Sequence, residues 1–139
     1  MAAGLRVLID LNVILDVLQR REPHFPASAQ VLACAETGWI DAYVAAHSLT
    51  TLFYLVAKDR FADQARVILG ELLQFLTVAG VDQQTIKAAL ELPYSDFEDA
   101  VQMAAATQIG AEYLITRDVA GFRVGPLTAL QPAELLTLL

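Results

Sequence analysis

Acidic residues stand at two points in the sequence where a catalytic or metal-binding carboxylate is expected. Asp10 ends the apolar run "LRVLI" and is followed at once by a segment with helical spacing. Asp118 lies two residues past a second strand-like run, "EYLIT". The carboxyl ends of parallel strands share one edge of a sheet, and ligands bind outside that edge. We therefore expect Asp10 and Asp118 to lie close together, although they are 108 positions apart.

A further pair of acids lies in the segment "YSDFEDAVQMAAATQIG". Asp96 and Asp99 are spaced i and i+3, so they share one face of a predicted helix near its N-terminus, whereas Glu98 points elsewhere. Acids in a first helical turn also complement the helix dipole, which is an equally good explanation for Asp96. Asp99 is the stronger candidate for chemistry.

Like charges gathered at one sheet edge would raise one another's pKa unless a cation lay between them. A set of oxygen ligands favours a hard cation such as Mg²⁺ or Mn²⁺. The spacing of Cys and His does not indicate zinc: His24 and His47 are isolated, and we expect each at the surface or at a helix cap. Asp16 is expected on the solvent side of its helix or in a local capping contact.

Short apolar runs alternate with segments of helical periodicity along the chain. The pattern predicts strands at residues 5–9, 40–46, 75–81, 112–116 and 126–130, and helices at 11–21, 27–37, 47–58, 60–74, 82–91, 96–109 and from Pro132 onward. Gly38 is a predicted helix stop, and Ser48 and Ser95 are predicted caps. Such alternation predicts one domain over residues 1–139, an α/β fold. Its expected architecture is a three-layer α/β/α sandwich with a central parallel sheet of four to five strands.

Composition limits the ways in which the chain can bind a ligand. The net charge of −7 argues against bulk electrostatic binding of nucleic acid, so bound dications would have to supply the attraction. Acids interrupt every apolar run before it could span a membrane, and the N-terminus has no signal-peptide pattern, so we expect a cytoplasmic protein with no membrane contact. The single cysteine, Cys34, fits a reducing compartment and a place in the core.

The apolar fraction is high, at 56% of residues. The surplus, which includes Phe53, Tyr54, Leu55 and the terminal "LLTLL", is explained either by a surface for a second protein or by a dense core. Trp39, Tyr43 and Phe53 are expected to pack rather than to stack on bases.

Four segments together resemble the PIN domain family, the fold of many VapC-like toxin ribonucleases. They are "VLIDLNVILDVL", "SLTTLFYLVAK", "YSDFEDAVQMAAA" and "YLITRDVAGF", which follow the family's order and approximate spacing over nearly the whole chain. The resemblance implies a metal-dependent endoribonuclease that cleaves single-stranded RNA, uses Mg²⁺ or Mn²⁺, forms a homodimer and pairs with an antitoxin protein.

The same resemblance assigns roles by motif position. It implies Asp10, Asp99 and Asp118 as catalytic acids, and these three with Asp96 as metal ligands. Asn12 and Thr116 resemble the polar residues that hold the acids or a metal-bound water in place. Thr51 stands where many members carry an acid; its hydroxyl can orient a water or a carboxylate but adds no negative charge. Gly121 is another departure, since many relatives have an acid there.

Basic residues beside the acidic edge are candidates for binding the RNA backbone. Arg117, next to Asp118, is the foremost, followed by Arg20 and Arg21, with Lys58 and Arg60 also near helix ends. Any one of them taken alone is better explained as an ordinary solvated charge, and Arg117 is the one that we favour as a phosphate contact.

Two alternatives to the nuclease remain open. A catalytically weakened PIN-like module that binds RNA or a protein is motivated by Thr51 and the acidic balance. A phosphoacceptor receiver or phosphatase would also use a strand-end Asp as a nucleophile. That reading expects a lysine at a later strand end, whereas the two lysines, Lys58 and Lys87, fall in predicted helices.

Overall fold

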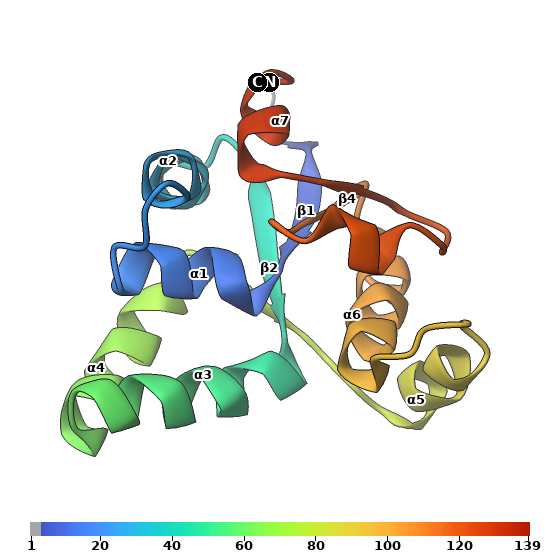
Figure 1. Cartoon of the computed structure of the whole chain (residues 1–139), viewed down its shortest axis with the longest axis horizontal. Helices are drawn as coiled ribbons and strands as arrows, with labels where there is room; N and C mark the ends of the chain where they lie inside the picture. The colour runs from blue at the N-terminus through green and yellow to red at the C-terminus, as the bar shows by residue number, and fades with distance from the viewer. Residues whose placement is uncertain (1–3) are drawn as a thin grey trace.

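The computed structural model describes residues 4–139 as a five-stranded parallel sheet enclosed by helices (Figure 1). The strands are β1 (Arg6–Ile9), β2 (Asp41–Ala45), β3 (Thr77–Ala79), β4 (Tyr113–Ile115) and β5 (Thr128–Leu130), in the spatial order β3-β2-β1-β4-β5. The helices are α1 (Leu11–Leu18), α2 (Phe25–Glu36), α3 (Ala46–Asp59), α4 (Ala62–Leu72), α5 (Gln83–Leu90), α6 (Phe97–Gln108) and α7 (Pro132–Leu136), with a 3-10 helix, η2 (Val119–Phe122), after β4. The predicted fold class and the order of elements are confirmed.

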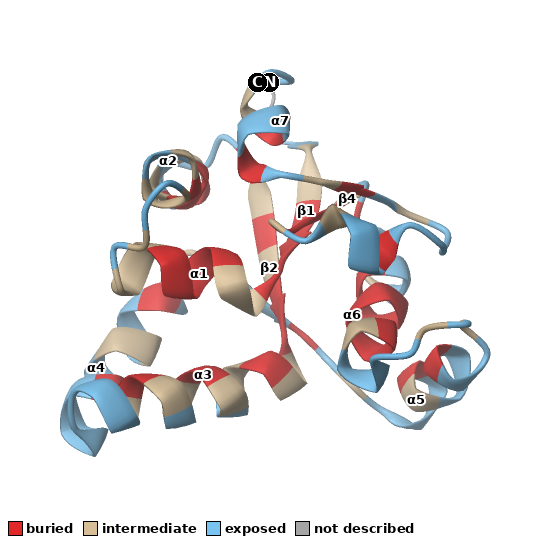
Figure 2. Cartoon of the chain, in the orientation of Figure 1, coloured by how far each residue is buried: buried red, intermediate tan, exposed pale blue. Residues whose placement is uncertain are grey.

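The central strand, β1, divides the core between two layers of helices. Val7 and Ile9 are fully buried in a cluster with α1, α2, α3, α4 and α7, whereas Leu8 is fully buried in a cluster with α6. Successive side chains of a strand point to opposite faces, so both faces of β1 must be covered. The buried positions of Figure 2 follow this division, with α1 on one side of the sheet and α6 on the other.

Two of the three predicted helix boundaries differ from the structure. Ser95 is not the cap of α6: Asp96 is, and its carboxylate accepts hydrogen bonds from the backbone amides of Glu98 and Asp99 at 2.9 and 3.3 Å. Ser48 is not a cap either, because α3 begins directly after β2 and leaves Ser48 buried in its first turn. Gly38 is confirmed as a stop, since it follows α2 with a φ of +81°.

Aromatic residues only partly follow the expectation of packing. Trp39 is 53% exposed and does not pack as predicted, because it lies in the turn between α2 and β2. Tyr43 and Phe53 are half-buried and pack against the two core clusters, as does Cys34. Within residues 4–139 the structure has no helix with both the length and the apolar character needed to cross a membrane.

Candidate active site

Asp10 occupies the junction where β1 ends and α1 begins. Its backbone amide donates to the carbonyl of Ile115 at 2.8 Å, which continues the β1–β4 pairing by one residue. Its carboxylate is 5% exposed, and each oxygen accepts one hydrogen bond: Oδ1 from Gln102 Nε2 at 3.1 Å and Oδ2 from Thr116 Oγ1 at 2.8 Å. A carboxylate oxygen has a second lone pair, so both atoms retain the capacity to bind a further donor or a cation.

Thr116 links the acids at the ends of β1 and β4. Its hydroxyl is buried and donates to Asp10 Oδ2, while the same oxygen accepts from the backbone amide of Asp118 at 3.1 Å. Its own amide donates to the carbonyl of Leu130, the residue that ends β5, at 2.9 Å. The predicted meeting of Asp10 and Asp118 at one sheet edge therefore rests on a single buried threonine.

Asp99 lies in the first turn of α6 and approaches the same edge from the opposite layer. A side-chain carbon added at Gly121 would lie 3.2 Å from Asp118 Oδ2 and 3.5 Å from Asp99 Oδ2, so both carboxylates face one small space. Burial, followed by the charges of Asp96, Asp10 and Asp118, raises the pKa of Asp99 from 3.8 to about 7. This carboxyl is therefore poised to change its protonation state near neutral pH.

The remaining predicted polar residues lie on α1, on α3 and at the start of α6. Asp96 caps α6, so the structure supports the dipole explanation for its position. Asn12 is half-buried in the first turn of α1, and Thr51 is half-buried in α3. The start of α3 reaches α6 through His47, whose Nε2 lies 3.2 Å from the carbonyl of Glu98.

Gln102 is the site residue that the sequence analysis missed. It is buried, and its side-chain amide holds Asp10 from the same face of α6 that carries Asp99, three residues earlier. The i, i+3 spacing from Asp99 was a signal that could have identified it. Glutamine was passed over because it is neither a usual metal ligand nor a proton-transfer group.

The four predicted metal ligands, which are Asp10, Asp96, Asp99 and Asp118, have the donor atoms that a hard cation prefers. They supply only oxygen ligands, and the ion pairs in the described part of the chain all involve other acids. Among residues 4–139, however, no three acidic, His or Cys side chains already stand together as a ligand set. Asp118 is exposed, and the side chains at this edge would have to move closer together to bind an ion.

Comparison with known proteins identifies the family that has this fold. A PIN domain sequence profile matches residues 6–120. The chain belongs to the PIN domain family. This PIN domain is similar to Ribonuclease VapC1 of Aquifex aeolicus (strain VF5), with 22% identity over 120 residues that cover 81% of each chain.

Solved structures share the fold of this PIN domain at low sequence identity. A chain of the VapBC2 complex from Rickettsia felis, bound to a DNA fragment from its promoter, gives a TM-score of 0.70 at 15% identity over 91% of this chain and 98% of that one. The Mycobacterium tuberculosis toxin VapC20, described as cleaving the sarcin-ricin loop, gives 0.61 at 12% identity over 78% and 86%. These likenesses establish the fold.

Asp16 of the PIN domain does not face solvent, which was the first of its two expected positions; the second, a local contact, is approached only by its pair with Arg21, five residues further on. It is fully buried, with Arg117 Nε 3.3 Å from Oδ2 and Arg21 Nη1 3.7 Å from Oδ1. Burying a carboxylate requires compensation by an opposite charge, and here two cations supply it. Arg117 comes from the segment after β4, so this partner could not be recognised from the helical pattern around Asp16.

The three arginines predicted to bind nucleic acid fall into two groups. Arg117 and Arg21 are partly exposed and both pair with Asp16. Arg20 is exposed, and its guanidinium lies over the ring of Phe25 at 5.4 Å from the ring centre. Arg117 therefore lies between the buried Asp16, with which it pairs, and the acidic edge, where the next residue, Asp118, is found.

Proposed function

We propose that this PIN domain is a ribonuclease that cleaves single-stranded RNA as the toxin of a toxin-antitoxin pair. The observation that carries the proposal is the single sheet edge at which Asp10, Asp99 and Asp118 come together, in a chain similar to a protein named Ribonuclease VapC1. The R. felis VapBC2 complex and a toxin-antitoxin complex from Klebsiella pneumoniae, with a TM-score of 0.69 at 19% identity over 91% of this chain, have the same fold.

Each residue of the edge has a defined task in this proposal. Thr116 and Gln102 fix the orientation of Asp10, and Thr116 also fixes the backbone at Asp118. Without a bound cation, burial and the neighbouring acids raise the pKa of Asp99 to about 7, and a cation held beside this carboxylate would lower its pKa again. The three carboxylates would hold Mg²⁺ or Mn²⁺, with Asp96 as a further ligand if it leaves its cap. When bound, such an ion supplies Lewis-acid activation of the phosphate and of a water.

Protein partners are part of the same proposal. Exposed apolar side chains gather on α3, on α4 and at the turn between them, where Tyr54, Phe61 and Val67 are 63%, 77% and 62% exposed. We assign this surface to a second copy of the chain or to the antitoxin. The terminal "LLTLL" contributes less than the sequence suggested, because Leu135 is fully buried in the core.

The decisive experiment is an RNA cleavage assay with wild-type protein, with and without Mn²⁺, beside Asp10→Asn. We expect cleavage by the wild type in Mn²⁺, none after chelation, and none with the variant. Asn keeps one acceptor for the Thr116 hydroxyl, and its NH2 group can donate to Gln102 Oε1, which has no partner in the wild type, once the Gln102 amide turns over; circular dichroism should therefore show an intact fold. Equal cleavage by the variant would contradict the assignment of the edge as catalytic.

A second candidate function is favoured by Thr51 and by the carboxylates of the described residues, which do not form a ready-made ligand set. In that case the chain is a weakened PIN module that binds RNA or a protein without cleaving it. Thr51→Asp with a Mn²⁺ binding measurement separates the two. A large gain in affinity from a negligible starting value would favour the binding module, and little change would favour the nuclease.

A further inference from the structure

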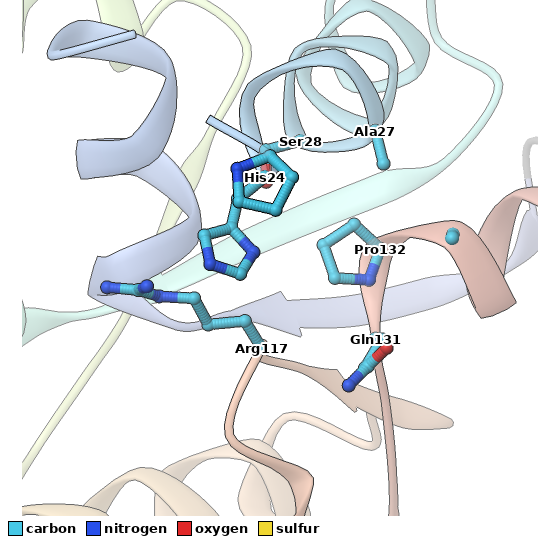
Figure 3. Close-up of a pocket in the computed structure, with 8 residues that line it drawn as sticks. His24, Ala27, Ser28, Arg117, Gln131 and Pro132 are labelled. Atoms are coloured by element: carbon cyan, nitrogen blue, oxygen red, sulfur yellow. The ribbon is translucent and has the colours of Figure 1, made fainter. Parts of the chain in front are cut away.

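A cavity of about 180 Å³ lies beside the acidic edge, between the start of α2 and the segments that follow β4 and β5. Figure 3 shows His24 and the Arg117 side chain on one side of it and Gln131 and Pro132 on the other, with Ala27 and Ser28 of α2 above. The cavity and the acidic edge are neighbours in the chain as well, because Arg117 lines the cavity and the next residue is Asp118. Nothing in the proposed mechanism uses it.

The start of α2 leaves positive potential directed at this cavity. The 12-residue helix begins without a side-chain cap and has no acid in its first turn. The amides of Phe25 and Ser28 donate to the carbonyls of Arg21 and His24, and Pro26 has no N–H, so among the described first-turn groups the Ala27 amide is left without a backbone partner, at the positive end of the helix dipole. A second observation is independent of the dipole: Ser28 lines the cavity and is fully buried, yet its hydroxyl has no hydrogen-bond partner.

The ion pairs below the cavity leave an excess of positive charge. Asp16 carries one negative charge and faces two cations, Arg21 and Arg117. Arg117 contacts Asp16 through Nε, and a guanidinium has four further N–H donors. A locally positive site in a chain with a net charge of −7 favours an anion.

We propose that this cavity binds a phosphate group of the RNA strand, one that neighbours the phosphate at the acidic edge. The inference rests on the proposed ribonuclease function and extends it to the substrate backbone. The volume is below the roughly 300 Å³ at which pockets for whole small molecules begin, so it suits a phosphate with its waters rather than a free nucleotide. Arg117 lines the cavity and Asp118 lies at the acidic edge, so these two neighbouring residues would contact neighbouring groups of one RNA strand.

Two substitutions place a negative charge in the cavity without disturbing the fold. Ala27→Asp acts from the first turn of α2, and Ala133→Asp acts from the first turn of α7 on the opposite side. Both positions favour an acid through the helix dipole, so thermal stability should be kept or raised. Gln30→Glu, on an exposed position of α2 outside the cavity, adds the same charge and is the matched control.

Binding of a short single-stranded RNA is measured by fluorescence anisotropy, without divalent ions, in an Asp99→Asn background. We expect each cavity variant to weaken binding by on the order of tenfold and the control by less than about twofold, because like charges at short range repel strongly. The dependence of log K on log salt should also become shallower by about 0.7, the value of one lost phosphate contact on a single strand. Inorganic phosphate should compete with RNA more strongly than chloride at equal ionic strength.

The outcomes separate this inference from the ribonuclease proposal. Equal RNA affinity in both cavity variants and the control overturns the phosphate site, even if wild-type protein cleaves RNA. Weakened affinity in the cavity variants supports the site, even if the wild type fails to cleave and the ribonuclease assignment falls. If inorganic phosphate competes with RNA but neither cavity variant changes the RNA affinity, the cavity binds an adventitious ion only, and this result counts against the site. If the variants fail to fold, failure of phosphate to compete for wild-type protein counts against it.

Discussion

Asp10 and Asp16 lie six residues apart, are both almost completely shielded from water, and yet have opposite surroundings. Asp10 receives hydrogen bonds from two neutral side chains and shares its edge with other acids. Asp16 faces two arginines. The carboxylate of Asp10 is thus held in one orientation without a positive partner, whereas the single negative charge of Asp16 faces two positive charges.

The difference shows that burial alone does not identify a functional carboxylate. A buried acid that is held by neutral donors keeps its charge available to a cation, and neighbouring acids make cation binding more favourable still. A buried acid paired with arginines has its charge committed to the fold and to the position of those arginines. One end of α1 therefore has the acid that we propose for chemistry, and the other end has an acid that is paired within the fold.

The largest expected effect is on catalysis at Asp10. Asp10→Asn removes the charge but keeps the hydrogen-bonding shape, so the fold should persist while cleavage falls by at least about 100-fold, the equivalent of several kcal/mol of lost ion and transition-state stabilisation. Initial rates of RNA cleavage in Mn²⁺ measure the loss. If Asp16→Asn reduced the rate as much with its fold intact, the contrast between the two acids would be wrong.

The next effect is on stability at Asp16. Asp16→Asn leaves two arginines without their buried partner and should lower the free energy of unfolding by about 2 kcal/mol, below the 3–5 kcal/mol of a fully buried pair because both arginines are partly exposed. Urea unfolding followed by circular dichroism measures it. Asp41→Asn is the control: its pair with Arg6 is shorter, at 2.8 Å, but both of its members are partly exposed, whereas Asp16 is fully buried, so less than about 1 kcal/mol should be lost. A larger loss at Asp41 would show that contact distance matters more than burial.

A smaller effect is expected at Thr116, which orients the acids without contributing charge. Thr116→Val keeps the shape but removes the hydrogen bonds to Asp10 and to the amide of Asp118, so the cleavage rate should fall by about tenfold. Thr116→Ser restores the hydroxyl and should recover most of the rate. Failure of the serine variant to recover activity would assign Thr116 a packing role only.

The smallest effect is a dependence of stability on pH at Asp99. Its folded-state pKa of about 7 lies above the ordinary 3.8, so between these values the folded chain holds a proton that the unfolded chain releases. Without divalent ions, the stabilisation is complete below about pH 4 and is lost as the pH rises through about 7. Melting temperatures recorded from pH 5 to 8 should therefore fall, and Asp99→Asn should flatten the trend. A trend that the variant does not change would assign it to other groups.

The fold was predictable because its signals are local. Short apolar runs and helical periodicity predicted every strand and α-helix of the described residues to within three residues, but not the 3-10 helix η2; β1 is buried on both faces and the α-helices are amphipathic. The caps were less predictable, because Asp96 and Ser95 are adjacent and both residue types cap helices.

The site was predictable only as far as strand ends define it. Asp10 and Asp118 were expected at one edge from topology alone, and the hydrogen bonds through Thr116 place them there. Gln102 and the pairing of Asp16 with Arg117 were not foreseen, because each depends on a side-chain contact between segments about 90 to 100 positions apart. Helical periodicity describes one segment at a time and contains no such information. The catalytic and metal-binding roles themselves stay predictions.

The hydrogen bond between Asp10 and Thr116 joins residues 106 positions apart. During synthesis on the ribosome, β1 and α1 emerge long before the strand that completes the edge, so an unfinished chain has its first acid but neither Thr116 nor Asp118 to accompany it. If the chain is a toxin, the cell is exposed to its activity only after nearly the whole domain has been made and has folded. The order of translation thereby delays assembly of the acidic edge until the end.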